Sequence, residues 1–231
     1  MNNHLPSDLI SLSFLSYAAI PFKAHIDAEE LCIDWGNGNT YENHTAQADT
    51  KLSYLFPAEG LQQITISGKN ISYLEISGMC ITDLRLLRCP HLEYLDCSGN
   101  EISLLDLSAC PVLEELHCNS NNLTELHLRN HPALTELQAS YNQLQRLILE
   151  NCPGVHTLHC THNRLEKIDV SGCPEICHIN VSHNFLESGA LDCLFQTLPV
   201  KEESDFATVR YFENPGFQEC RGKLFRSKKW H

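Results

Sequence analysis

The chain has 231 residues, of which 42% are hydrophobic and 19% are charged, and its formal net charge is −13. This acidic balance argues against a nucleic-acid partner, because binding to the phosphate backbone requires a surface rich in Lys and Arg. No segment approaches the roughly 20 apolar residues of a membrane-spanning helix. We therefore expect a globular protein that does not bind nucleic acid and has no membrane-spanning helix.

The first 60 residues show no repeat and are predicted to be short strands joined by turns. Residues 9–22 are apolar but lack the preceding basic residues and the cleavage site of a secretory signal, so a strand is predicted there. Residues 24–33 are also predicted to be extended, and the Asn-Gly within residues 34–38 favours a hairpin. We expect residues 1–60 to form an N-terminal β cap. The Leu-x-x-Ile-x-Ile pattern of residues 61–66 is similar to half of one repeat unit.

Residues 71–186 repeat with a period of 21, and the unit reads L-x-x-L-x-C-x-x-N-x-L-x-x-L-x-L-x-x-C-P-x. Each unit can bury its apolar residues only against its neighbours, so the chain is predicted to stack as a solenoid. Alternation of apolar and polar residues around positions three to five predicts a strand. The Asn at position nine ends that strand and can bond backbone groups in its own turn and in the next coil. The Leu-x-Leu spacing that follows predicts a second extended segment, not a helix.

Seven of the 12 cysteines fall in two columns of the repeat. They are Cys97, Cys118 and Cys160 at position six, and Cys89, Cys110, Cys152 and Cys173 at position nineteen. The same columns accept Ile76, Ala139, Val181 and His131. A disulfide or a metal ligand would not tolerate aliphatic replacements, whereas a small buried apolar side chain would, so we interpret these cysteines as core packing. Disulfides between coils and a ladder of metal ligands are the alternatives.

After Leu186 the apolar spacing changes to three and four, which predicts a helix over residues 189–198. A last strand is predicted over residues 209–212 and a turn over 214–216, so residues 187–231 are expected to form a C-terminal cap of helix and strand. The domain organisation is therefore a cap over 1–60, a solenoid over 61–186 with regular units from about residue 71, and a cap over 187–231. A basic terminal segment, interpreted as solvated, contains Arg221, Lys223, Arg226, Lys228 and Lys229.

The motif Leu-x-x-Leu-x-Cys-x-x-Asn-x-Leu resembles the leucine-rich repeats, and residues 92–111 and 155–174 match it best. More narrowly, it is similar to the bacterial internalin-type repeat of 21 residues, in which a cysteine ladder replaces the usual strand Leu. The resemblance implies a fold between α/β and mostly β: a right-handed solenoid whose parallel sheet lines a concave side and binds another macromolecule. Many members of that class are secreted or displayed on the cell surface. The sequence shows no leader, anchor or lipid-attachment Cys, so the cytoplasm is the default and the surface is expected only if a leader was removed.

Stacked strands lie about 4.8 Å apart, so columns of the repeat become rows of side chains on one face. Tyr and carboxylates dominate the early part of that face, and Tyr is enriched in protein interfaces. A protein partner with basic residues is therefore predicted, against the alternative of an acidic solvated face. The candidate partner-binding residues on the concave face are Tyr73, Glu75, Tyr94, Asp96, Glu115, His117, Glu136, Gln138 and Tyr141.

Imidazoles occupy the later part of the face, at His159, His162, His178 and His183. Side chains about 5 Å apart could share Zn²⁺ or Ni²⁺, or could form a pH-sensitive cluster. No spacing motif such as H-E-x-x-H supports a metal, so no metal and no cofactor are predicted.

The sequence also lacks a nucleophile elbow, a Gly-rich phosphate loop and a buried carboxylate pair, so no enzymatic activity is predicted. A non-enzymatic protein-interaction module, serving surface recognition or adhesion, is the leading hypothesis. A metal- or small-molecule-binding surface at the imidazoles and a rigid structural spacer are the alternatives. The partner and the oligomeric state are left open.

Overall fold

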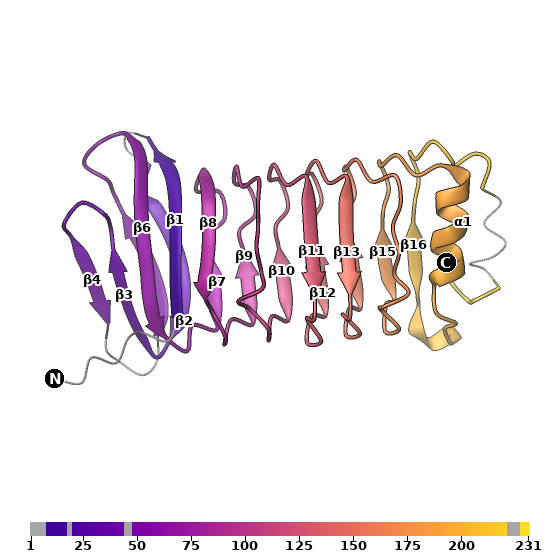
Figure 1. The fold of residues 1–231 in the computed structure, drawn as a ribbon, viewed down its shortest axis with the longest axis horizontal. Helices are drawn as coiled ribbons and strands as arrows, with labels where there is room; N and C mark the ends of the chain where they lie inside the picture. The colour runs from indigo at the N-terminus through magenta and orange to yellow at the C-terminus, as the bar shows by residue number, and fades with distance from the viewer. Residues whose placement is uncertain (1–7, 18–19, 44–47, 221–226) are drawn as a thin grey trace. The chain divides into compact units, whose positions relative to one another are not determined.

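The computed structural model describes residues 8–17, 20–43, 48–220 and 227–231. The chain is mostly β with one α-helix, and it divides into two units, residues 1–113 (unit 1) and residues 114–231 (unit 2) (Figure 1). In the described part of the chain, no helix has the length and apolar character needed to cross a bilayer. The parallel pairing of strands one repeat apart confirms the mostly β solenoid predicted from the period.

The first sheet of unit 1 is antiparallel and is organised around β1 (Asp8–Ser16). β1 pairs with β6 (Gly60–Lys69) and with β8 (Ile81–Arg88), while β3 (Glu30–Asp34) pairs with β6 and with β4 (Thr40–Asn43). Alternate side chains of β1 are buried, as the period of two in its sequence requires. The β3–β4 pair confirms the hairpin predicted at Asn37-Gly38.

Residues 61–66 are part of β6, which is antiparallel to both of its neighbours, so the expected half coil at this position is wrong. In a coil the first Leu of the motif points inward, but Leu61 is 70% exposed. Only the alternating pair Ile64 and Ile66 is buried. The apolar period of two therefore prevails over the Leu-x-x-Ile spacing.

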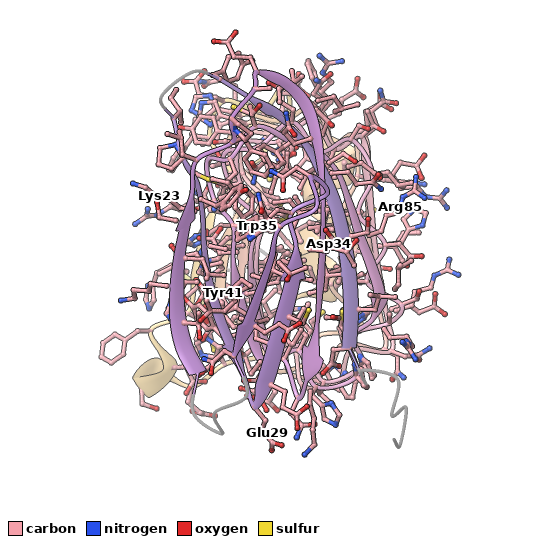
Figure 2. All side chains as sticks on the ribbon, turned by 90° about the vertical axis from the view of Figure 1, so that its left-hand side faces the viewer. Lys23, Glu29, Asp34, Trp35, Tyr41 and Arg85 are labelled. Atoms are coloured by element: carbon pink, nitrogen blue, oxygen red, sulfur yellow. The ribbon has the colours of Figure 1, made fainter. Side chains whose placement is uncertain are left out.

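The second sheet of unit 1 joins N-terminal strands to strands of the repeat. β2 (Phe22–Ala28) is antiparallel to β5 (Ala48–Tyr54) and to β7 (Tyr73–Glu75), whereas β7 is parallel to β9 (Tyr94–Asp96). Aromatic rings fill the space between the two sheets, with Trp35 stacked on Tyr54 at 4.2 Å between centroids. Figure 2 shows Lys23 of β2 and Arg85 of β8 on opposite sides of unit 1, with Trp35 between them.

Unit 2 contains regular coils whose three-residue strands are all parallel. These strands are β10 (Glu115–His117), β12 (Glu136–Gln138), β14 (Thr157–His159), β15 (His178–Asn180) and β16 (Thr208–Arg210). The four that belong to the repeat occupy positions three to five of their units, as predicted. The second extended segment is also confirmed, because β11 (Glu125–Arg129) and β13 (Arg146–Glu150) pair in parallel on the other side (Figure 1).

The C-terminal elements of unit 2 lie close to their predicted places. Helix α1 (Ser188–Thr197) buries Leu191, Leu194 and Phe195, and β16 extends the parallel sheet beyond β15. A short 3₁₀ turn, η1 (Glu203–Asp205), lies between them. The boundaries drawn at residues 60 and 186 stay predictions.

The basic terminal segment is only partly within the described residues, since Arg221, Lys223 and Arg226 lie outside them. Lys228 is not simply solvated: its Nζ donates to the carbonyl oxygens of Gln196 and Leu198 at the end of α1. A cation there complements the partial negative charge of the helix C-terminus. The N–H of Val209 in β16 donates to the carbonyl oxygen of His231 at 2.9 Å, so residues 228–231 join the end of α1 to β16.

The Asn at position nine forms a ladder through the coils. Asn142 accepts from the backbone N–H of Leu123 at 3.0 Å and donates to the carbonyl oxygens of Cys118 at 2.9 Å and Ala139 at 3.3 Å. Its amide thus joins two successive coils, as predicted. Asn214 continues the ladder by accepting from Leu186 N–H and donating to Val181 O. The sequence predicted only a turn at Asn214, because it follows Asn184 by 30 residues and breaks the period.

The cysteine columns pack in the core. All seven of their side chains are fully buried, and all 12 cysteines of the chain are free thiols. Burial raises the pKa of Cys160 to about 12, so this thiol stays protonated and inert at neutral pH. The interpretation of these columns as packing is confirmed.

Candidate partner-binding surface

The strand face is defined here as the outward side chains at positions three and five of the parallel strands. Each of these strands buries its middle residue and leaves the flanking two half-exposed. Alternation in an extended backbone causes this pattern. Eight of the nine predicted partner-binding residues lie on the strand face. In unit 1 they are Tyr73, Glu75, Tyr94 and Asp96, and in unit 2 they are Glu115, His117, Glu136 and Gln138.

A pair of stacked tyrosines dominates the strand face of unit 1. Tyr73 and Tyr94 are register partners in β7 and β9, and their rings lie 4.3 Å apart at an interplanar angle of 4°. The Tyr73 hydroxyl donates to Glu75 Oε2 at 3.2 Å. Burial raises the pKa of Tyr73, and the neighbouring Tyr94 and Glu75 add to the shift, so its hydroxyl remains a donor. The pair is a rigid, half-exposed aromatic surface with a polar edge.

His25 of β2 also belongs to this aromatic surface, although no pattern in the sequence indicated it. The antiparallel register of β2 and β7 places His25 opposite Glu75, with His25 Nδ1 3.6 Å from Glu75 Oε2. The imidazole ring also lies 4.7 Å from the Tyr73 ring. β2 lies outside the repeat, so the 21-residue period contains no information about its pairing.

Carboxylate, imidazole and amide groups form a connected row on the strand face of unit 2. His117 Nε2 lies 3.8 Å from Glu115 Oε2 and 3.6 Å from Glu136 Oε1. Gln138 Nε2 donates to Glu136 Oε1 at 2.8 Å, and Gln138 Oε1 lies 3.1 Å from His159 Nδ1. Burial lowers the pKa of His159, and the Arg210 charge acts in the same direction.

Tyr141, the ninth predicted residue, lies beyond the strand at position eight. Its ring stacks on His162 at 4.4 Å, and His162 stacks on His183 at 4.0 Å. We call these three side chains the aromatic column. All three residues have positive φ, at 57°, 55° and 55°. The pKa of His162 is lowered by burial, with a further contribution from His183.

The four imidazoles considered as metal ligands fall into separate contacts. His162 and His183 belong to the aromatic column, His159 contacts Gln138, and His178 Nδ1 lies 3.1 Å from Thr208 Oγ1. Among the described residues, the donor atoms that converge belong to Glu115, His117 and Glu136, and they lie within 4.8 Å of one another. The sequence could have indicated this cluster, because Glu115 and Glu136 occupy the same position in successive units and His117 lies two residues after Glu115.

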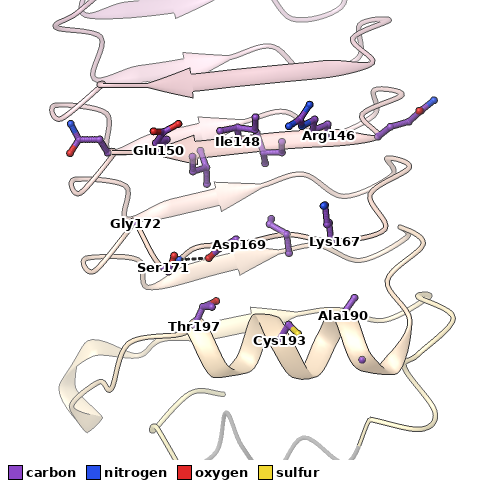
Figure 3. Close-up of a pocket in the computed structure, with 16 residues that line it drawn as sticks. Arg146, Ile148, Glu150, Lys167, Asp169, Ser171, Gly172, Ala190, Cys193 and Thr197 are labelled. Carbon is purple, nitrogen blue, oxygen red and sulfur yellow. Dashed lines mark hydrogen bonds between the residues drawn. The ribbon is translucent and has the colours of Figure 1, made fainter.

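The opposite side of unit 2 has a hollow that the sequence did not predict. It measures about 720 Å³ and lies between β13, residues 167–172 and α1 (Figure 3). Arg146, Ile148 and Glu150 line one side of it, and Cys193 of α1 lines another. The hollow arises where a helix replaces the extended second half of the coil, because small residues of α1 do not fill the same space.

Parallel three-residue strands, an Asn ladder and buried cysteine columns together define a leucine-rich-repeat solenoid. No family model matches the sequence, and no curated protein matches it either. Among solved structures the chain is similar to the internalin InlF from Listeria monocytogenes, with 17% identity, a TM-score of 0.41 and coverage of 62% of this chain and 54% of that one. It is also similar to the functional domain of InlJ from Listeria monocytogenes, described as including a cysteine ladder, with 20% identity, a TM-score of 0.33 and coverage of 68% and 47%. The chain thus spans about half the length of either.

Proposed function

We propose that this chain is a non-enzymatic protein-interaction module whose strand face recognises a protein partner carrying basic residues. The observation that carries the proposal is the stacked pair of Tyr73 and Tyr94 on an acidic face. Stacked rings that are already ordered lose little conformational entropy when a partner covers them. Tyr also combines a large apolar area with a polar tip, which suits the centre of an interface.

The distribution of charge on the strand face supports a basic partner. Positions three, five and seven of the six sequence units, all of which are described, contain four carboxylates and no Lys or Arg. The carboxylates are Glu75, Asp96, Glu115 and Glu136. The second extended segments, by contrast, mix both signs, as in the ion pair of Arg129 with Glu150 at 3.1 Å. Arg210, the register partner of Asn180 in β16, is a cation on the same face, but the four carboxylates outnumber it and so attract basic side chains and speed their encounter.

The aromatic column extends this surface in unit 2. Tyr141 is 56% exposed, and the rings of His162 and His183 continue the stack toward the C-terminal coil. Side chains held on left-handed backbone cost stability, and such residues cluster at functional sites. The column therefore belongs with the partner-binding residues.

The proposal is tested with three immobilised baits compared by quantitative mass spectrometry of the captured proteins. The first bait is the wild-type chain, and the second carries Tyr73→Ala, Tyr94→Ala and Glu115→Ala. The third is a matched control that carries His127→Ala, Arg129→Ala and Ile148→Ala in β11 and β13. All three must show the same urea midpoint before they are compared.

A partner retained by the wild-type and control baits, and lost from the strand-face bait, is the expected result. Its binding should also weaken as salt is raised, since screening reduces the attraction between exposed charges. Partners captured equally by all three baits would refute the assignment of binding to the strand face.

A further inference from the structure

We propose that Glu115, His117 and Glu136 form a binding site for a divalent transition metal, best suited to Zn²⁺. The three side chains come from two neighbouring strands of unit 2 and lie on the same face. This inference depends on those residues alone and does not require a protein partner to exist.

The backbone holds the three donors in place. β10 and β12 are parallel, and their register sets Glu115 directly beside Glu136. Leu116 and Leu137, the middle residues of the two strands, are fully buried and fix both strands to the core. His117 follows two residues after Glu115, so it projects from the same face. Donors on rigid strands need little ordering to bind an ion.

The distances fit a coordination shell better than a set of hydrogen bonds. His117 Nε2 lies 3.8 Å from Glu115 Oε2 and 3.6 Å from Glu136 Oε1. A hydrogen bond between nitrogen and oxygen spans about 2.7–3.2 Å, so both contacts are too long. Ligands at about 2.0–2.1 Å from a tetrahedral Zn²⁺ are separated by about 3.3 Å, so small side-chain movements would close the three donors on an ion.

An outer layer of contacts orients Glu136. Gln138 Nε2 donates to Glu136 Oε1 at 2.8 Å, and Gln138 is itself in contact with His159. Partners of this kind hold a ligand in position and are a regular feature of metal sites. The side chains of Glu115, His117 and Glu136 are 44%, 24% and 35% exposed, so one side of the group faces solvent. A water molecule can therefore complete the coordination.

The ligand types favour a particular class of ion. Ca²⁺ and Mg²⁺ take oxygen ligands, whereas an imidazole with carboxylates suits Zn²⁺ and its transition-metal neighbours. Two carboxylates and a neutral imidazole carry a net charge of −2, which a divalent cation neutralises. Neither β10 (Glu-Leu-His) nor β12 (Glu-Leu-Gln) contains a Lys or Arg that would compete with the ion.

The chain contains a natural control for this site. Residues 125–127 have the same sequence, Glu-Leu-His, as residues 115–117, and His127 Nε2 lies 3.0 Å from Glu125 Oε2. In the neighbouring strand, however, the register partner of Glu125 is Arg146 and not a second carboxylate. Glu125 and His127 have the same spacing as Glu115 and His117, but they lie beside the positive charge of Arg146, so we expect them not to bind a metal ion.

The test is calorimetric titration of chelator-treated protein with Zn²⁺, followed by Co²⁺ spectroscopy. We expect one ion per chain, with affinity reduced at least about tenfold by His117→Ala or Glu136→Gln. Glu125→Gln and His127→Ala should leave the affinity unchanged. Glu136→Gln is nearly isosteric, so it guards against loss of binding through misfolding. The Co²⁺ complex should show visible d–d bands without a thiolate charge-transfer band, which separates this site from the free cysteines.

Three results would overturn the metal site: no heat with Zn²⁺, equal affinity in the His117→Ala and wild-type chains, or a thiolate band that disappears with Cys193→Ala. A failure here is distinct from a failure of the proposed partner binding, because the titration contains no partner. Likewise, Tyr73→Ala with Tyr94→Ala should abolish partner capture while leaving Zn²⁺ affinity intact.

Discussion

The two units form the same backbone turn at position eight of the repeat, but with different residues. At position eight, unit 1 has Gly78 and Gly99 with φ of 66° and 68°, whereas unit 2 has Ser120 at 55° and then the aromatic column. Left-handed backbone costs a residue other than Gly roughly 1–2 kcal/mol, and Gly pays no such cost. The turn therefore requires a φ value and no side chain. The bulky residues of unit 2 are not explained by the fold, which is why we assign them to recognition.

The neighbouring position shows the opposite behaviour. Position nine is Asn in both units wherever the ladder runs, because its amide bonds backbone groups of two coils. Adjacent positions thus differ in kind, one fixed by hydrogen bonding and one free to vary. Substitutions at the two positions therefore separate the effect of hydrogen bonding from the effect of backbone conformation.

Removing one step of the ladder should be the most damaging change. Asn142→Ala leaves the buried Leu123 N–H without its acceptor and removes the amide donor from the carbonyl oxygens of Cys118 and Ala139, of which Cys118 keeps the Asn121 amide at 3.2 Å. We expect a cost of about 3 kcal/mol in the free energy of unfolding. Urea denaturation measures this loss. The exposed neighbour Asn122→Ala is the control and should change stability by less than about 0.5 kcal/mol. Equal effects at the two positions would contradict the ladder.

Placing an aromatic ring at position eight of unit 1, where Gly occurs, should reduce stability by a smaller amount. In Gly99→Tyr the new Cβ meets the Gly78 backbone at 3.5 Å, which is an ordinary contact, so strain at positive φ is the main penalty. We expect a loss of about 1–2 kcal/mol in the free energy of unfolding, measured by urea denaturation. A stability equal to wild type would mean that the turn does not discriminate against side chains.

The reverse change in unit 2 should be nearly neutral for stability. His162→Gly relieves the backbone strain but loses stacking on Tyr141 and His183, which is worth about 0.5–1.5 kcal/mol per aromatic pair. We expect the unfolding free energy to change by less than about 1 kcal/mol, because relief of roughly 1–2 kcal/mol of backbone strain largely offsets the lost stacking of these exposed rings. Partner binding should weaken all the same. A large destabilisation would show that the column is structural.

Acidic pH should slightly lower the free energy of unfolding, because the imidazoles of unit 2 become protonated. Burial lowers the pKa of His159, His162 and His178, with neighbouring positive charge assisting. The unfolded chain therefore takes up protons first, so stability is complete above about pH 6.5 and declines as pH falls below it. The effect is small, since solvent screens these partly exposed groups. Urea midpoints at pH 7.5 and pH 5.5 should differ less in a variant with all three changed to Gln; an unchanged difference would refute this cause.

The period made the coils predictable, because it sets each strand, the ladder and the rows of the strand face together. Features outside the period were not predictable in the same way. Asn214 continues the ladder out of phase, His25 reaches Glu75 by an antiparallel pairing, and residues 61–66 follow a period of two. The convergence of Glu115, His117 and Glu136 required the register of β10 and β12, although the rows contained its residue types. The sequence thus predicts local repetition well and long-range pairing poorly.

Binding of a partner to the strand face can be tested by photo-crosslinking to a captured partner from single positions in unit 2. A photoactivatable residue replaces Gln138 on the strand face or, as the control, Ile148 of β13, and both lie within regular strands of the same unit. We expect a strong crosslink to the partner from position 138 and none from position 148. A crosslink from position 148 alone would contradict this expectation and would place binding on the opposite side of the solenoid.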